Sequence, residues 1–325
     1  MSLKKAAEAI KKYSKFLITA HTSLEGDALG SELAFYMLLR KLGKEAYIVN
    51  EDGIPYEYGF LPRKEIVRKF DKGVLRLDFD CFVALDCSDL RRTGEVYKLN
   101  SKYAPVINID HHISNEMFGD VNWVDPHSSS ASEMIYRLYK YMHIAFTDES
   151  ALFLYVGIFT DTGSFRYSNT TSFTHKAASE LLKFKISVPQ VYNNVYGNIP
   201  YQDIKALTRI FPNLKLESAG KIAWVQIERA MLKESEQSFD IADHVLSFAR
   251  AIRGVEVVVL FRHNLGVKDE IRINFRSQGK VDVNKIAKEF GGGGHKTASG
   301  ATVRGDINQV RRKVLSRIKE EVSKL

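Results

Sequence analysis

The chain has 325 residues, of which 45% are hydrophobic and 26% are charged, and its formal net charge is +8. This length favours two domains, and the composition excludes a disordered or fibrous protein. No apolar run approaches the roughly 18 residues that span a bilayer, and the first residues lack the apolar core of a secretory signal. We therefore expect a cytoplasmic protein with no membrane partner. The positive charge weakly favours nucleotides or RNA as partners.

Short β-rich runs alternate with helical patterns up to about residue 185. This alternation predicts βαβ units and a parallel sheet. The expected strands cover 15–21, 45–50, 80–86 and 105–111, and the expected helices cover 31–43, 132–142 and 149–162.

The pattern changes after residue 185. Residues 186–212 contain Pro189 and Pro200 and indicate a helical linker. Strands are then expected in "GKIAWVQIE", "GVEVVVLFRH" and "EIRINFRS", with helices at 241–253, at 282–290 and at the C-terminal end. We predict two α/β domains, a parallel-sheet domain over 1–185 and a smaller mixed α/β domain over 213–325, with an active-site cleft between them.

Acidic and imidazole side chains follow the predicted strands at the point where each strand ends. Ligands bind outside the carboxyl ends of parallel strands, so these side chains should meet at one edge of the sheet. The residues are His21, Glu25 and Asp27, then Asp86 and Asp89, then Asp110, His111 and His112, and finally Asp161, which lies at the end of a buried helix.

Carboxylates and imidazoles without thiolates suit Mn²⁺ or a similar divalent ion better than structural zinc. Taken singly, an aspartate at a strand end is more often a turn or helix cap, and a lone histidine is more often solvated or part of the core. Four coincident clusters favour a metal site. Their number exceeds the needs of one ion and fits a two-metal site that activates water against a phosphoryl group.

A glycine-rich segment, "EFGGGGHKTASGA", covers residues 289–301. Its amide groups could cradle a phosphate beside His295 and Lys296, although a flexible loop is the alternative. In "EIRINFRS", Arg272, Asn274 and Arg276 should share one face of a strand. Such a face suits a nucleotide backbone or is simply solvated.

These motifs, in this order, resemble those of the DHH phosphoesterase superfamily. "HTSLEGDALGS", "LDCSD", "IDHH" and "GIFTDTGSFRYSNT" are similar to its four motifs, and "FGGGGHKTASGA" is similar to the signature of its DHH-associated C-terminal domain. Size and layout resemble the group of oligoribonucleases (nanoRNases) that also act as pAp phosphatases.

The resemblance implies roles for individual residues. His21, Glu25 and Asp86 would hold one Mn²⁺, and Asp27, Asp86, His111 and Asp161 would hold a second, with Asp86 bridging the two; Co²⁺ or Mg²⁺ could replace Mn²⁺. His112 would contact the phosphate and Asp110 would orient His111, so that His112, Asp110 and Asp86 form the catalytic group. Arg276, Gly293, Gly294 and His295 would bind the nucleotide.

The implied activity is hydrolysis of short oligoribonucleotides and of linear dinucleotides such as pApA and pGpG to mononucleotides, together with pAp phosphatase activity. A homodimer is also expected from the resemblance. Glu25 departs from the family motif, which normally has aspartate there. This departure leaves a nucleotide-binding sensor with weakened catalysis as one alternative, and a cyclic-dinucleotide phosphodiesterase is another. A pyrophosphatase fits less well because of the glycine-rich signature, and a long-strand exonuclease fits less well because of the chain length.

Overall fold

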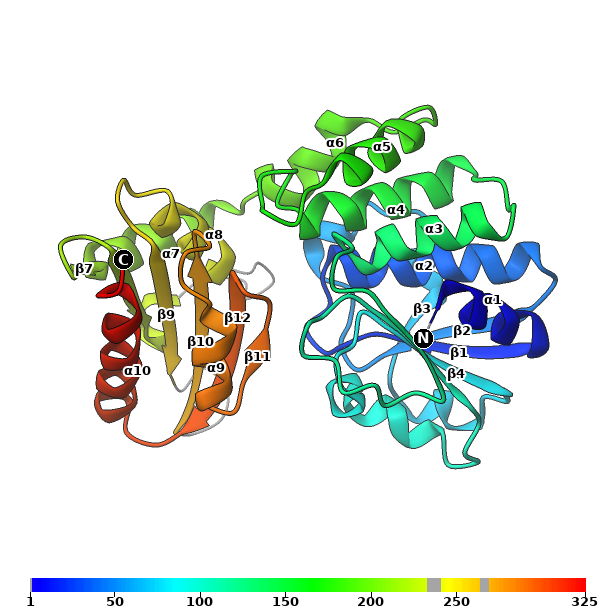
Figure 1. Ribbon diagram of the computed structural model, residues 1–325, viewed down its shortest axis with the longest axis horizontal. Coiled ribbons are helices and arrows are strands. Elements are labelled where there is room, and N and C mark those ends of the chain that lie inside the picture. The colour runs from blue at the N-terminus through cyan, green and yellow to red at the C-terminus, as the bar shows by residue number, and fades with distance from the viewer. Residues whose placement is uncertain (1, 233–240, 264–268) are drawn as a thin grey trace. The chain divides into compact units, whose positions relative to one another are not determined.

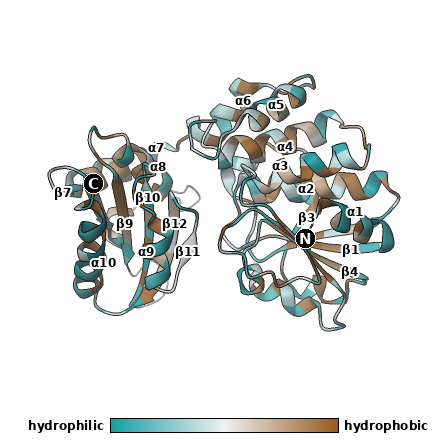
Figure 2. Cartoon of the chain, in the orientation of Figure 1, coloured by the Kyte–Doolittle hydropathy of each residue, from teal (hydrophilic) through white to brown (hydrophobic). Residues whose placement is uncertain are grey.

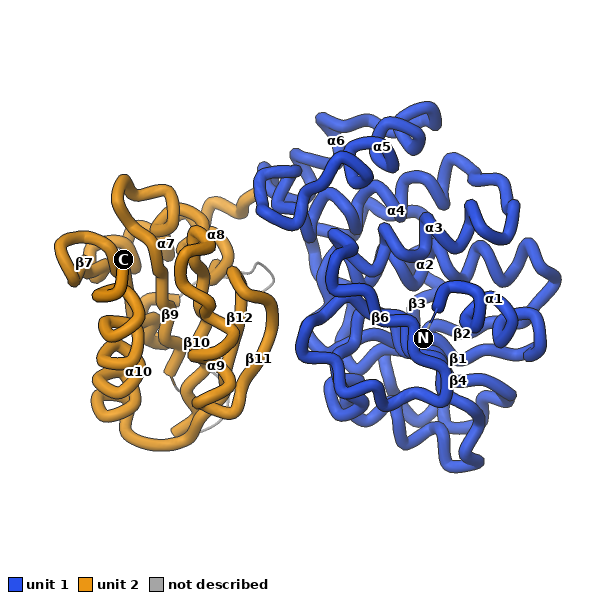
Figure 3. The backbone as a smooth tube through the Cα atoms, in the orientation of Figure 1, with its two compact units in different colours: residues 1–198 blue, residues 199–325 orange. Residues whose placement is uncertain are grey.

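The computed structural model describes residues 2–232, 241–263 and 269–325, and the chain forms two compact units, residues 1–198 and 199–325 (Figures 1 and 3). The segment expected to be a helical linker contains α6 (Val188–Tyr192), a π-helical turn (Asn193–Gly197) and α7 (Tyr201–Ile210). The two units divide this segment between Asn198 and Ile199.

The first unit is built on a six-stranded sheet in the order β3-β2-β1-β4-β5-β6, and all of its strand pairs are parallel. This confirms the predicted parallel sheet. The first strand in sequence lies near the middle, so strands that are distant in sequence become neighbours. The strands are β1 (Lys15–Thr19), β2 (Glu45–Asn50), β3 (Val67–Lys69), β4 (Cys81–Leu85), β5 (Val106–Asp110) and β6 (Val121–Val124).

Helices of the first unit cover one face of its sheet. Phe16, Ile18 and Val83 point into the core that these helices share, and Figure 1 shows α2, α3 and α4 stacked beside the strands. The strands are hydrophobic over most of their length (Figure 2), as expected for strands buried on both faces. The helices are α1 (Leu3–Lys12), α2 (Gly26–Lys41), α3 (Ala131–Tyr141), α4 (Asp148–Asp161) and α5 (Ser172–Leu181).

The opposite face of this sheet is covered by 3₁₀ turns. Leu17 and Phe82 point to this face because side chains alternate along a strand. They pack there with Val96 from the turns at Leu90–Leu99. The other 3₁₀ segments of this unit are Tyr56–Tyr58, Lys64–Ile66 and Lys72–Arg76. None of the helices in the described parts of the chain is both long and apolar enough to cross a membrane.

The second unit has a mixed six-stranded sheet in the order β11-β12-β10-β9-β8-β7, in which only β8 and β9 pair in parallel among the described pairs. Helices α9 and α10 pack on one face and α7 and α8 on the other. The elements are β7 (Lys215–Glu217), β8 (Ile222–Ile227), α8 (Ile241–Arg250), β9 (Val257–His263), β10 (Glu270–Ser277), α9 (Val283–Glu289), β11 (Gly293–Gly294), β12 (Ala298–Arg304) and α10 (Ile307–Val322), with 3₁₀ turns at Phe211–Asn213 and Arg229–Leu232.

Two sequence-based expectations need correction. The helix expected from residue 31 begins at Gly26, so Asp27 lies in its first turn and not in a loop. This helix is buried on several sides, which hides the apolar periodicity that marks a helix start. The glycine-rich segment is not a loop throughout, because Gly293 and Gly294 pair with Gly300 and Ser299 as strands β11 and β12.

Candidate active site

The six predicted metal ligands all lie in the first unit, at the carboxyl edge of its sheet. His21 follows β1, Asp86 follows β4 directly, and His111 follows β5 directly. These three strands are neighbours in the order β1-β4-β5, which brings their carboxyl ends together. The remaining ligands come from helices, with Glu25 and Asp27 at the start of α2 and Asp161 at the end of α4.

Asp86 lies at the centre of this group, and its two carboxylate oxygens face different partners. Oδ2 lies 3.5 Å from Nε2 of His21, which is itself 3.5 Å from Oε1 of Glu25. Oδ1 lies 3.3 Å from Nε2 of His111. One oxygen therefore belongs to the set with His21 and Glu25, and the other belongs to the set with His111.

The second set is completed by carboxylates from two helices. Nε2 of His111 lies 3.8 Å from Oδ2 of Asp27 and 3.7 Å from Oδ2 of Asp161. Glu25, the departure from the family motif, reaches His21 at the distance given above although its side chain is half exposed. The longer glutamate side chain therefore still places its carboxylate with His21 and Asp86, the other two members of the first set.

The backbone of Asp86 is in the left-handed region, with φ of 52°. This conformation is uncommon for residues other than glycine, although aspartate and asparagine tolerate it better than most. Its amide donates to the carbonyl of Ile109 at 3.0 Å, which continues the pairing of β4 with β5. The left-handed turn thus ends the strand and directs the carboxylate across the sheet edge.

Asp27 is held by the N-terminus of α3. The amides of Ala131 and Ser132 donate to its two oxygens at 2.6 and 2.8 Å, and the helix dipole favours a negative charge there. A glycine makes this approach possible, because a Cβ at Gly157 would overlap Oγ of Ser132 and lie 2.8 Å from Oδ1 of Asp27. Close packing of α2, α3 and α4 therefore positions this carboxylate.

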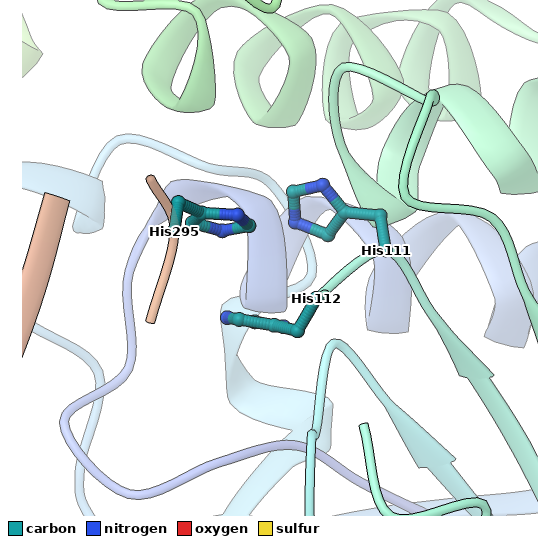
Figure 4. A group of neighbouring side chains, drawn as sticks. All are labelled: His111, His112 and His295. Carbon is teal, nitrogen blue, oxygen red and sulfur yellow. The ribbon is translucent and has the colours of Figure 1, made fainter. Parts of the chain in front are cut away.

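Asp110 forms its hydrogen bond with His112, the neighbour of the histidine that the resemblance pairs with it. Oδ1 of Asp110 accepts a hydrogen bond from Nδ1 of His112 at 2.7 Å, and Oδ2 accepts one from Nδ2 of Asn115 at 2.6 Å. Residues 110 and 112 share a side because side chains alternate along an extended chain. His111 and His112 leave the end of β5 with ring centroids 5.1 Å apart and planes inclined by 58° (Figure 4).

Burial and mutual charge shift the pKa values of these side chains strongly. Burial raises the pKa of Asp27 to about 6, with the charge of Asp86 adding to it, and burial raises that of Asp161 well above its usual range. Burial opposes charge on His21, but the nearby carboxylates of Asp86 and Glu25 outweigh it and raise its pKa to about 10. The carboxylates thus repel one another and attract positive charge, which is the electrostatic environment of a cation site.

The donor set fits divalent metal ions. Nε2 of His21 and Oδ1 of Asp86 are buried and have no hydrogen-bond partner among the described residues, although buried polar atoms are normally paired. Metal ions hold such ligands at about 2.1 Å, so two ligands on one ion lie roughly 3.0–3.4 Å apart, close to the separations around Asp86. The groups His21–Glu25–Asp86 and Asp27–Asp86–His111 each offer three ligand atoms within 4.8 Å of one another.

Some groups that support this site have a signal in the sequence, and others have none. Asp89 was grouped with the strand-end carboxylates, but it caps the 3₁₀ turn after it by accepting from the amide of Arg91. Asn115, which supports Asp110, lies three residues after the "IDHH" motif, and this nearness is a signal by which it could be found. The two amides that hold Asp27 could not, because every residue except proline has a backbone N–H.

The predicted nucleotide-binding residues lie in the second unit, on β10 and on the β11–β12 hairpin. Arg276 on β10 pairs with Asp243 on α8, with 3.0 Å between Nη2 and Oδ1. Gly294 has φ of 134°, which favours glycine. The amide of His295 donates to the carbonyl of Ala298 at 2.7 Å, which closes the turn between the strands.

Comparisons with known proteins identify the family. Residues 15–158 match the DHH family, N-terminal domain, and residues 225–324 match the DHHA1 domain. A bifunctional oligoribonuclease and PAP phosphatase NrnA of Thermus thermophilus is 31% identical over 312 residues, which cover 94% of this chain and 90% of that protein. The chain belongs to the DHH family.

Other members of this family and fold are similar over nearly the whole chain. The protein of the same description from Bacillus subtilis is 30% identical over 301 residues, covering 90% of this chain and 91% of that one. The crystal structure of an exopolyphosphatase-related protein from Bacteroides fragilis has a TM-score of 0.84 at 24% identity and covers 99% of this chain and 95% of its own. Both DHH and DHHA1 domains are therefore present in the expected order.

Proposed function

We propose that this DHH-family phosphoesterase is a Mn²⁺-dependent phosphodiesterase that hydrolyses short oligoribonucleotides and linear dinucleotides to mononucleotides, with pAp phosphatase activity. The observation that carries the proposal is the position of Asp86, whose two carboxylate oxygens face two separate ligand sets. The names of the relatives from Thermus thermophilus and Bacillus subtilis support oligoribonucleotides and PAP as substrates.

In this proposal, His21, Glu25 and Asp86 hold one ion. Asp27, Asp86, His111 and Asp161 hold the other. Such ions supply Lewis-acid chemistry when bound, which activates water and neutralises charge on a phosphoryl group.

The protein's own side chains orient the substrate. Because Nδ1 of His112 donates a hydrogen bond to Asp110, Nε2 is the nitrogen that this ring presents to a phosphoryl oxygen. Asn115 fixes Asp110 from its other side, so the imidazole is held in one orientation. In the second unit, we propose that Arg276 and His295 bind the nucleotide with the amides of Gly293 and Gly294.

Turnover of a 5′-labelled RNA series, from a dimer to a 24-mer, tests this proposal, with pAp assayed beside it in Mn²⁺. Rapid loss of the shortest oligomers is expected. Asp86→Asn preserves the left-handed backbone and Asp161→Ala removes one ligand. Because charge stabilisation by the ions contributes several kcal/mol, each variant should lower kcat by about 10³-fold or more.

Asp78→Asn is the matched control, because Asp78 is an exposed carboxylate of the same unit that pairs with Lys15. It should leave turnover unchanged. Degradation of the 24-mer in preference to the dimer would overturn the short-substrate proposal. Binding of Mn²⁺ without turnover of any member of the series would favour the alternative, a nucleotide-binding sensor with weakened catalysis.

A further inference from the structure

The segment between α4 and α5 contributes an asparagine that touches a proposed metal ligand. Nδ2 of Asn169 lies 3.3 Å from Oδ2 of Asp161, 3.0 Å from the carbonyl of Asp161 and 2.9 Å from the carbonyl of Ser129. All three partners are acceptors, so only the NH₂ end of the amide can face them. The orientation of this side chain is therefore fixed by its surroundings.

Asn169 also connects α4, which carries Asp161, to the start of α3, which holds the carboxylate of Asp27. Asp161 is the last residue of α4. Ser129 precedes the N-cap of α3, whose first amides hold Asp27. One amide group thus ties the end of α4, at the proposed ligand Asp161, to the residue that precedes the N-cap of α3.

The other end of the amide has an unused acceptor. Oδ1 of Asn169 is buried and has no hydrogen-bond partner among the described residues. A buried acceptor without a donor costs free energy, and a water molecule beside Asp161 would supply that donor. If Asn169 had a purely structural role, both its Nδ2 and its Oδ1 would be expected to form hydrogen bonds with other protein atoms.

We propose that Asn169 is a positioning residue that sets the affinity of the second ligand set, Asp27, Asp86, His111 and Asp161, for its divalent ion. It does so by fixing the carboxylate of Asp161 in the direction of His111. The inference rests on the metal site of the proposed function. Hydrogen-bonding partners of metal ligands commonly change metal affinity by about 10–100-fold when they are removed.

Calorimetric titration of the metal-free full chain with Mn²⁺ tests this, because it measures binding without turnover. Asp161→Asn identifies which of the two binding steps belongs to the second set. Asn169→Ala should weaken that same step by about 10–100-fold and leave the other unchanged. Ser168→Ala, an exposed neighbour in the same segment, should change neither step.

Unfolding of the metal-free proteins is measured alongside, and Asn169→Ser, which keeps a donor on a shorter side chain, replaces the alanine variant if that variant does not fold. Unchanged affinity in the folded variant would overturn the proposal. An equal loss in both steps would also overturn it, because that pattern indicates a general structural role. A wild-type chain that binds no Mn²⁺ would instead contradict the proposed function itself.

Discussion

At the scale of single residues, Asp86 shows how chemistry and backbone geometry meet in one position. Its carboxylate is the contact shared by the two ligand sets, and its left-handed φ is what turns it across the sheet edge. Among residues other than glycine, asparagine, aspartate and histidine are enriched in that conformation, and of these three only aspartate supplies a carboxylate. Both the backbone and the proposed ligand role therefore favour aspartate at this position.

Glu32 is a buried carboxyl group that the proposed chemistry does not use. It lies on α2, where Oε2 accepts from Nδ2 of Asn50 at 2.8 Å and Oε1 has no hydrogen-bond partner among the described residues. Burial raises its pKa from 4.5 to about 8. In the folded protein this group is therefore protonated at pH values where the unfolded chain has already lost the proton.

Replacement of Glu32 by glutamine should change stability in a pH-dependent way. Because the pKa of Glu32 is higher in the folded protein than in the unfolded chain, its contribution to stability is complete below pH 4.5 and is lost as the pH rises to about 8. Between these pH values, the free energy of unfolding of the wild type should fall by roughly 1.4 kcal/mol per pH unit relative to that of Glu32→Gln. Urea unfolding in chelator at several pH values measures the difference, and a difference independent of pH would contradict the assignment.

The grouping of the proposed ligands is predictable from sequence, because their residue types suit a metal and parallel strands end at one edge of the sheet. Asn169 was not, although it lies in a quoted motif, because an amide side chain has many uses and its partners are two backbone carbonyls and one carboxylate. The resemblance pairs Asp110 with His111, whereas the hydrogen bond that Asp110 accepts in the structure comes from His112. Sequence gives the alternation of side chains but not the point at which a strand stops.

At the scale of elements, glycines decide how closely the helices of the first unit approach. A Cβ at Gly26 would lie 2.5 Å from Oγ1 of Thr160, and one at Gly30 would overlap the carbonyl of Phe153. With Gly157, these residues let α2, α3 and α4 approach one another closely. Asp27 and Asp161, at the ends of these helices, are brought together as a result.

Gly157→Ala should therefore disturb both packing and metal binding. The added methyl group would overlap Ser132 and approach Asp27, and overpacking of this kind costs typically about 1–3 kcal/mol. Unfolding and Mn²⁺ titration measure the two effects. Gly53→Ala is the matched control, because a Cβ there would meet nothing within 4 Å; equal behaviour of the two variants would contradict the packing argument.

The glycine-rich hairpin was the least predictable element. Glycine disfavours strands, so Gly293 and Gly294 gave no strand signal. Their pairing depends on β12, which in turn pairs with β10 over seven residues from each strand. Tertiary pairing overrides local preference here, and sequence patterns within one segment cannot show it.

At the scale of the whole molecule, each unit has hydrophobic cores of its own. The cores of the first unit include Phe16, Leu17 and Phe82, and those of the second include Phe261 and Val258. The alternation of strands and helices predicted two α/β domains, because each βαβ unit needs its helices to cover a sheet. The boundaries expected at 185 and 212 remain predictions.

Residues 1–198 and 199–325 should therefore each fold when produced separately. Each fragment should unfold in one cooperative transition, and the first fragment should still bind Mn²⁺ because all six proposed ligands lie within it. Denaturation followed by circular dichroism, together with metal titration, checks both statements. A fragment without a cooperative transition would show that its cores need the rest of the chain.

The strand order has a consequence for how the protein is made. β1 leaves the ribosome first, yet its sheet neighbour β4 follows more than sixty residues later, and such long-range pairing is slow to form. The proposed ligands extend from His21 to Asp161, so a nascent chain that stops short of α4 cannot assemble them all. Loading of both proposed ion sets would thus require a chain that extends at least to Asp161, so the topology would limit capture of a full pair of ions by an unfinished polypeptide.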